Sequence, residues 1–275
     1  MISRSSLILD VEGIRNPLLP GKVKEREEGD DTPDIPSPIN TQIVCIGAMM
    51  LDEHMHYRKF RFFGESRAEL IEFASLLNNT KLRVVTFNGR RYDMPVIMHA
   101  MFRHGIQCRR YYAASKNDDF RYRYSINGPH LDLLDHLSDF GNARRASLDQ
   151  YAKSIGLPGK DGTSGDDVQG MWVRGEVEAI RTYNAQDVLC TAAVTMRDQW
   201  MIGGFQYRVD FDRAVRGMVE GMVKDVPSLA EYCGRIDMDR FLDVYEKPSK
   251  EPLPINPPPP ELPLSPDPPP FMVDG

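Results

Sequence analysis

Hydrophobic and polar residues alternate or cluster at strand spacing over several stretches of the first half of the chain. Residues 6–12 (SLILDVE) predict one strand, and residues 41–51 and 56–64 predict two more that pair as a hairpin. Residues 81–89 (KLRVVTFNG) hold a continuous apolar run, which is typical of a buried strand. Residues 130–138 (HLDLLDHLS) predict a further strand that leads into a helix. We therefore expect a multi-stranded sheet.

Apolar positions at helical spacing lie between and after these strands. One helix begins after Ser66, which is placed as its N-cap, with Glu69 positioned to complete a capping box. Early strands followed by alternating helices and strands predict an α/β fold in which helices cover both faces of a mixed sheet. The expected helices span residues 66–79, 92–105, 147–156 and 175–204, with further helices over about 205–247.

Two segments have the composition of non-globular chain. Residues 16–40 are charged and studded with proline, and we expect them to form a long loop inserted between two strands. Residues 248–275 contain twelve prolines, which remove backbone donors and favour an extended conformation. The predicted organisation is one domain over residues 1–247 and a disordered tail over 248–275, with the tail a possible docking peptide for a protein partner.

The charge of the chain does not exclude a nucleic-acid partner. The net charge of −6 argues against one at first. The two proline-rich segments each carry a net charge of −3, however, and the rest of the chain is therefore neutral. A neutral domain with local basic patches can bind a phosphate backbone.

The cysteines and the N-terminus point to a reducing compartment. The four cysteines are scattered without a CxxC pair, so we expect free thiols in the cytosol rather than a zinc site or a disulfide framework. The N-terminal stretch has only a three-residue apolar run before its first acid, which is too short for a signal peptide or a membrane span. A cytoplasmic protein without a membrane partner is expected.

A pair of acids near the end of the first predicted strand is the first candidate for chemistry. Asp10 and Glu12 in LDVEG are two residues apart, so strand alternation places both on one face. That face cannot be buried against an apolar layer without cost. An exposed edge strand would explain the pair by itself. The apolar run LIL before Asp10 favours a central strand with a site at its end.

A second group of polar residues follows the apolar strand over 81–89. The stretch FNGRRYD places Asn88 at the strand end, Arg90 and Arg91 in a short turn, and Asp93 at the start of a helix. Helix capping alone would explain Asp93. Ligands also bind commonly where a strand ends and a helix begins. The two arginines could hold phosphates there, although surface turns often carry arginine without any function.

The third group lies within the long predicted helix. In TYNAQDVLC, Tyr183 and Asp187 are four residues apart, which places them on one helical face about 6 Å apart at the backbone. Asn184 lies on another face of this helix. Packing of the ring and pairing of the carboxylate would be a purely structural explanation.

The order of these three groups is more specific than any one of them. LDVEG, FNGRRYD and YNAQD resemble the three motifs of the DEDD superfamily of 3′–5′ exonucleases, in the subgroup that has tyrosine in its third motif. The chain is most similar to the predicted exonucleases related to the proofreading domain of family B DNA polymerases, over roughly residues 6–204. This resemblance implies an RNase H-like α/β/α fold.

The resemblance also implies roles for individual residues. Asp10, Glu12, Asp93 and Asp187 would bind two Mg²⁺ or Mn²⁺ ions about 4 Å apart, in a two-metal-ion phosphoryl displacement. Tyr183 would orient the attacking water. With an ordinary pKa near 10, its phenol is neutral at pH 7 and so positions water better than it removes a proton. The expected substrate-binding residues are Asn88, Arg90 and Arg91, with Asn88 either contacting the terminal nucleotide or ordering the loop.

The expected function is therefore a metal-dependent 3′–5′ exonuclease that releases nucleoside 5′-monophosphates from single-stranded ends, with DNA favoured over RNA and DNA repair as one setting. A non-catalytic nucleic-acid-binding or scaffold protein that keeps the fold is the first alternative. The complete acid set argues against it. A structure-specific endonuclease is the second alternative, and the tyrosine of the third motif argues against that.

Two further stretches have more than one explanation. Residues 109–125 mix arginines with four tyrosines, which fits either a rim that stacks bases or, slightly preferred, a β-hairpin with a tyrosine face. Asp132 and Asp135 lie near the end of the strand predicted over 130–138. They either support the site from behind the metal ligands or, in the preferred interpretation, serve the structure alone.

Overall fold

The computed structural model describes residues 4–19, 36–113, 118–124, 127–159 and 167–246. The chain divides into two units, 1–244 and 245–275, and all the elements below lie in the first. The proline-rich tail over 248–275 lies outside the described residues, as do residues 20–35 of the expected insertion. Among the described helices, none combines the length and the apolar character that crossing a membrane requires.

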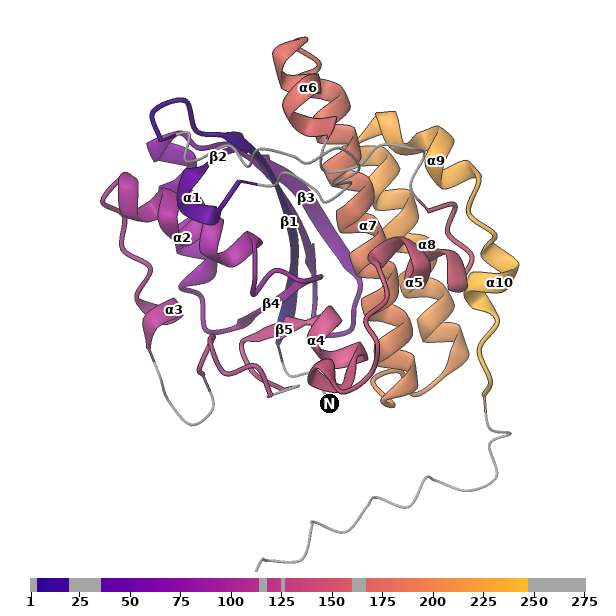
Figure 1. Ribbon diagram of the computed structural model, residues 1–275. Coiled ribbons are helices and arrows are strands. Elements are labelled where there is room, and N and C mark those ends of the chain that lie inside the picture. Colours follow the sequence, from indigo (N-terminus) through magenta and orange to yellow (C-terminus); the bar gives the residue numbers. More distant parts are fainter. Residues whose placement is uncertain (1–3, 20–35, 114–117, 125–126, 160–166, 247–275) are drawn as a thin grey trace, which may run out of the picture. The chain divides into compact units, whose positions relative to one another are not determined.

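A five-stranded mixed sheet forms the centre of the first unit, in the order β3-β2-β1-β4-β5 (Figure 1). β1 pairs antiparallel with β2, and β2 pairs antiparallel with β3. On its other side β1 pairs parallel with β4, which pairs parallel with β5. The strands are β1 (Ser5–Arg15), β2 (Thr41–Leu51), β3 (Tyr57–Phe63), β4 (Leu82–Thr86) and β5 (His130–Asp132).

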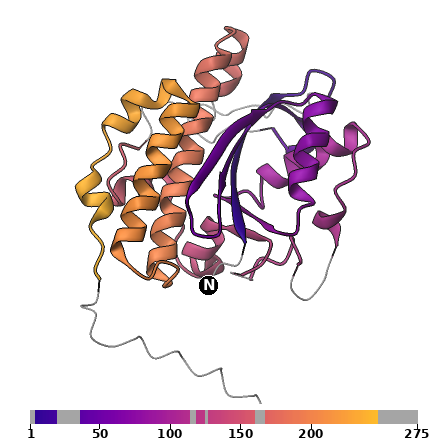
Figure 2. The ribbon, with the colours of Figure 1, turned by 180° about the vertical axis from the view of Figure 1, so that it is seen from behind.

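Helices cover both faces of this sheet, as the hydrophobic pattern predicts (Figures 1 and 2). One layer contains α1 (Arg67–Leu77) and α2 (Asp93–Arg103), and the other contains α7 (Val177–Met201) and α8 (Arg208–Asp225). The remaining helices are short: α3 (Arg109–Tyr112), α4 (Leu133–Leu137), α5 (Leu148–Ser154), α6 (Val168–Val173), α9 (Ala230–Gly234) and α10 (Met238–Leu242). Three 3₁₀ turns complete the elements: η1 (Pro38–Asn40), η2 (Asp139–Gly141) and η4 (Pro227–Leu229).

Strand β1 shows how the sequence divides its residues between the two layers. Leu7, Leu9 and Val11 pack into the cluster that α1 and α2 form, whereas Ile8 packs into the cluster of α7 and α8. Alternation therefore turns Asp10, like Ile8, toward the layer of α7. β1 lies in the middle of the sheet, which excludes the exposed edge strand as the explanation of its two acids.

The long helix α7 runs across this second face and is buried almost all round. It contacts β1, β2 and β4 on one side and α5, α6 and α8 on the other. Two glycines in the left-handed region bound it, Gly175 (φ 75°) before it and Gly203 (φ 78°) after it. An L side chain rarely adopts that conformation, so the glycines mark the ends of the helix.

The insertion between β1 and β2 leaves their pairing intact. The backbone N–H of Asn16 donates to the carbonyl of Asn40 at 2.8 Å, and Arg15 pairs with Thr41. The two ends of the segment 16–40 therefore meet at the end of the β1–β2 ladder.

The hairpin preferred for residues 109–125 is wrong for the residues described there. Arg109–Tyr112 form the short helix α3, and residues 118–124 form turns without strand pairing. The physical reason is the buried side chain of Arg110. It donates to the carbonyls of Asn79 and Leu82, and it pairs with Asp118 at 2.9 Å. These contacts hold the segment against the end of α1 rather than along a sheet edge.

Candidate active site

The carboxyl ends of β1, β4 and β5 lie along one edge of the sheet, because these three strands are parallel. Asp10 and Glu12 lie in β1 toward this edge. β2 carries an irregularity opposite Glu12, where Cys45 pairs with Glu12 but Ile43 pairs with Gly13. Such a bulge re-aims side chains locally and is common next to active sites.

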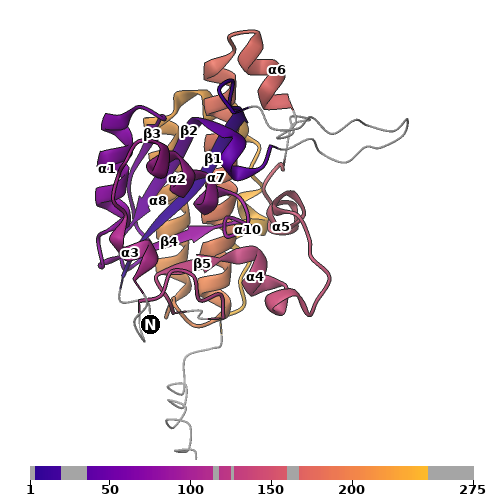
Figure 3. The same cartoon turned by 60° about the vertical axis from the view of Figure 1, so that its left-hand side comes forward.

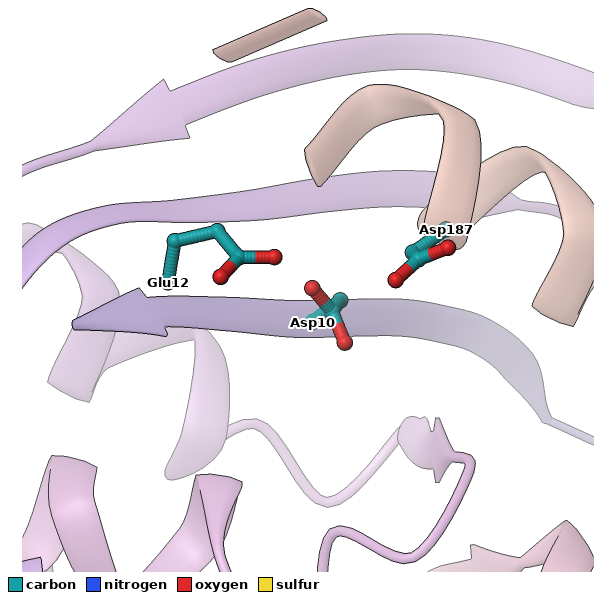
Figure 4. A group of neighbouring side chains, drawn as sticks. All are labelled: Asp10, Glu12 and Asp187. Carbon is teal, nitrogen blue, oxygen red and sulfur yellow. The ribbon is translucent and has the colours of Figure 1, made fainter. Parts of the chain in front are cut away.

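Helix α7 brings a third acid to the two acids of β1. Carboxylate oxygens of Asp10, Glu12 and Asp187 lie within 4.8 Å of one another (Figure 4). Glu12 is 7% exposed and Asp187 is 8% exposed, whereas Asp10 is half-buried. The fold thus brings three of the acids predicted from the sequence, two in β1 and one in α7, into one cluster.

This cluster fits a divalent cation. Three carboxylates that share a buried space repel one another, and each would disfavour the charge of the other two. Hard oxygen donors of this kind are the ligands that Mg²⁺ and Mn²⁺ prefer. The side-chain amide of Asn184 also donates to Asp10 Oδ2 at 2.8 Å, which leaves the negative charge of that carboxylate in place.

The structure places Asp93 beside this cluster, on the open side of β1. Pairing between β1 and β4 ends at Ile8 and Val85, so the N–H of Val11 has no strand partner there. Asp93, in the first turn of α2, accepts that N–H at 2.9 Å through Oδ1. Burial, with the negative charges of Asp132 and Asp187, raises the pKa of Asp93 to about 7. The charge of Asp187 therefore acts on Asp93, although Asp93 is not one of the three acids whose carboxylate oxygens lie within 4.8 Å of one another.

The turn between β4 and α2 is held by Asp132, the last residue of β5. Its carboxylate accepts the backbone N–H of Asn88 at 2.8 Å, of Arg90 at 2.9 Å and of Leu134 at 3.1 Å. Asn88 has a φ of 65°, a left-handed conformation that asparagine tolerates better than most residues. Asp132 thus supports the turn that carries Asn88 and Asp93. Its hydrogen bonds are structural, but the turn that they hold belongs to the candidate site, so Asp132 does not serve the structure alone.

The two arginines of this turn differ. The guanidinium of Arg90 donates to the carbonyls of Phe120 and His130, both at 2.7 Å, and its Nε lies 3.6 Å from Asp135. These contacts engage the guanidinium in holding the segment before β5, which speaks against the phosphate contact expected for Arg90. Arg91 is exposed, and its role in binding substrate stays a prediction.

Tyr183 lies against the acid cluster from the first half of α7. Its side chain is 5% exposed. Burial, the negative charges of Asp187, Glu12 and Asp10, and a hydrogen bond to Asp187 all raise the pKa of its phenol. The hydroxyl therefore stays protonated at neutral pH and acts as a neutral hydrogen-bonding group.

Sequence reasoning missed Asn184 because it lies about 100° around the helix from Tyr183. On a helix with one buried face, that direction would lead away from the site. α7 instead lies against β1 and β2, and its wide contact surface includes Asn184 as well as Asp187.

Comparisons with known proteins agree with this fold. A family model described as "Predicted 3'-5' exonuclease related to the exonuclease domain of PolB" matches residues 36–236. The match begins after β1, so Asp10 and Glu12 lie outside it. A search of curated proteins gives no match.

Among solved structures, the family B DNA polymerase of the archaeon Pyrobaculum calidifontis superposes with a TM-score of 0.50 at 13% identity. The superposition covers 85% of this chain and 30% of the polymerase. An exonuclease I structure matches with a TM-score of 0.37 at 14% identity, over 76% of this chain and 42% of that one. The zinc-bound complex of E. coli ExoI with single-stranded DNA matches with a TM-score of 0.36 at 13% identity, over 68% and 43%.

This chain thus spans less than half the length of each of these structures. At such low identities the likeness concerns the fold, an RNase H-like mixed sheet between helical layers. The family model covers most of the chain, and the protein therefore belongs to the family of predicted 3′–5′ exonucleases related to the exonuclease domain of PolB.

Proposed function

We propose that this protein is a divalent-metal-dependent 3′–5′ exonuclease that hydrolyses single-stranded nucleic acid, with DNA favoured over RNA. The observation that carries the proposal is the cluster of Asp10, Glu12 and Asp187 at the carboxyl edge of the sheet. The three acids lie on a central strand and a buried helix, and two of them are buried. A solvated acidic surface therefore does not explain the cluster.

Asp10, Glu12 and Asp187 would hold the metal, with Asp93 as the fourth acid beside them. Bound there, Mg²⁺ or Mn²⁺ supplies positive charge to the phosphate and lowers the pKa of bound water. The chain itself contributes a preorganised set of oxygens and a neutral phenol. Tyr183 would hold a water molecule by its hydroxyl, which stays protonated at neutral pH because its pKa is raised.

The surface next to the turn of Asn88 has features that suit the binding of single-stranded nucleic acid. Tyr122 and Tyr124 are 54% and 57% exposed, with ring centroids 5.9 Å apart, and the guanidinium of Arg123 lies 5.5 Å from the ring of Tyr124. Exposed aromatic rings stack with bases of any sequence, whereas the guanidinium of Arg123 already pairs with Asp135 at 2.6 Å. Arg90 links this segment to the site, since it also reaches the carbonyl of Tyr122 at 3.4 Å.

Digestion of labelled oligonucleotides tests the proposal. DNA and RNA strands labelled at the 3′ or the 5′ end are incubated with Mg²⁺, with Mn²⁺ or with EDTA. We expect release of a labelled mononucleotide at once from 3′-labelled strands, a ladder from 5′-labelled strands, and no cleavage in EDTA. In Asp10→Ala and Asp187→Ala, the rate should fall by at least about a hundredfold, because the metal site stabilises charge worth several kcal/mol.

Asp239→Ala serves as the matched control, since Asp239 is an exposed aspartate of α10 and should be silent. Full activity in EDTA or in Asp10→Ala would overturn the proposal. Binding of single strands without cleavage under either metal would favour the non-catalytic alternative. Cleavage of a circular single strand, which has no 3′ end, would favour an endonuclease.

A further inference from the structure

The side chain of Asn184 is buried completely between α7 and the first two strands. Its exposed fraction is 0%, and its Nδ2 donates to Asp10 Oδ2 at 2.8 Å. Its Oδ1 has no hydrogen-bond partner within the part of the chain that the structure describes. A buried amide with an unpaired oxygen is a poor device for stability alone, because the unpaired oxygen loses its hydration.

The residue of β2 that lies against this amide is a glycine and has no side chain. Gly47 of β2 is the residue that pairs with Asp10. A Cβ added to Gly47 would lie 2.0 Å from Asn184 Oδ1, far inside van der Waals contact. Gly47 therefore provides the space that allows the amide of Asn184 to reach Asp10.

We propose that Asn184, held over Gly47, is a positioning residue that fixes the carboxylate of Asp10 for the metal. The amide restrains the orientation of that carboxylate by one hydrogen bond. It does so without charge, whereas a lysine or an arginine at this place would compete with the cation. The inference rests on the metal-dependent function proposed above and adds two residues, Asn184 and Gly47, to that site.

Outer partners of this kind orient metal ligands, and their loss typically weakens metal binding by about 10- to 100-fold. Asn184→Leu is the sharpest variant, because leucine has the branched shape of asparagine but neither of its polar atoms. Removing the unpaired oxygen along with the donor should leave the fold intact. We expect an unchanged or higher melting temperature without metal, together with Mn²⁺ binding weaker by about 10- to 100-fold.

Two measurements report metal binding without any catalysis. The first is the rise of melting temperature with Mn²⁺ concentration, which follows from preferential binding to the folded state. The second is the electron paramagnetic resonance signal of free Mn²⁺ in titrations of the protein. Thr195→Val is the matched control, because Thr195 is equally buried in α7 but lies about 16 Å along the helix from Asn184. Its hydroxyl bonds only within the helix in the contacts described, to the carbonyl of Thr191.

Gly47→Ala tests the same arrangement from the opposite strand. The added methyl group should displace the amide and weaken Mn²⁺ binding as Asn184→Leu does. In the background Asn184→Ala the nearest clashing atoms are gone and Val188 Cγ2 remains at 3.1 Å from an added Cβ, so Gly47→Ala should have little further effect on Mn²⁺ affinity. The two substitutions are thus expected to be strongly non-additive.

Mn²⁺ binding within twofold of wild type in Asn184→Leu would overturn the role of Asn184, as would fully additive effects of Gly47→Ala and Asn184→Ala. Should Asn184→Leu fail to fold, Asn184→Ala is measured by the same titrations and decides the question by the same limits. A wild-type protein that binds no Mn²⁺ would overturn the metal-dependent function itself, and this inference with it. The two failures are therefore distinguishable.

Discussion

At the scale of single residues, the site is defined by which side chains the packing turns toward Asp10. The period of two in β1 predicts that Asp10 and Glu12 share a face, and the period of α7 predicts that Tyr183 and Asp187 share another. Both periods are local, so the sequence reveals the pairs. It does not reveal that Asn184 also reaches Asp10, because that depends on α7 lying across two strands at once.

Tyr183 is the residue whose role is most open to a direct test. Tyr183→Phe keeps the ring in the cluster of Ile14, Cys45 and Ile180 and removes only the hydroxyl. If that hydroxyl holds the attacking water, catalysis should fall by roughly ten- to a thousandfold, the range for one aligned polar group in a transition state. Single-turnover cleavage of a 3′-ended oligonucleotide, with metal titrated in both proteins, provides the measurement.

Mn²⁺ affinity in Tyr183→Phe should stay close to wild type, because the phenol is not a proposed ligand. This separates Tyr183 from Asn184, whose loss is expected to act through the metal. Equal turnover of Tyr183→Phe and wild type at saturating metal would mean that the four-residue spacing of Tyr183 and Asp187 serves packing alone.

At the scale of elements, the strands and long helices follow the hydrophobic pattern closely. The helix expected over 66–79 runs from Arg67 to Leu77 with Ser66 as its N-cap, and the helix expected over 175–204 runs from Val177 to Met201. The hydrophobic pattern fails to predict the local structure where the contacts of a single buried polar residue determine it. In the segment 109–125, the contacts of Arg110 determine the conformation, and the alternating tyrosines do not. These contacts involve residues outside the local pattern, so the pattern does not reveal them.

The turn between β4 and α2 is an element that depends on one such distant contact. Asp132→Ala removes the acceptor for three backbone N–H groups, two of them in this turn. We expect the free energy of unfolding to fall by about 2 to 4 kcal/mol, since hydrogen bonds to a charged acceptor contribute about 1.5 to 3 kcal/mol each and water will replace part of them. Urea unfolding without metal measures this loss.

Nuclease activity of Asp132→Ala should fall as well, under conditions where the protein is still folded, because the same turn carries Asn88 and leads into Asp93. Asp239→Ala should change the free energy of unfolding by less than about 0.5 kcal/mol, as exposed substitutions usually do. If Asp132→Ala matched that control in stability, the turn would be held by other contacts.

At the scale of the whole molecule, the sequence predicts the class of fold but not the order of its strands. Alternating strands and helices predict a mixed sheet with two helical layers. The placement of β1 between an antiparallel hairpin and two parallel strands follows from pairings between residues far apart in the chain, such as Ser5 with Leu82. Figure 3 shows the consequence: β4 lies next to β1, β5 lies next to β4, and α4 follows β5.

The last prediction concerns the proline-rich tail. The unit of residues 1–244 contains all three hydrophobic clusters and all of the candidate site, so we expect it to fold without residues 248–275. Twelve prolines and few apolar side chains give that segment little to bury. Removing 248–275 should therefore shift the melting temperature by less than about 2 °C, which for a unit of this size corresponds to less than about 1 kcal/mol. The nuclease rate should stay within about twofold, because none of the groups proposed to position metal or water is lost. Differential scanning calorimetry and the oligonucleotide assay, run on both forms, give the two numbers. A large drop in melting temperature alone would show that the tail packs on the domain, and a drop in rate alone would show that it contacts substrate.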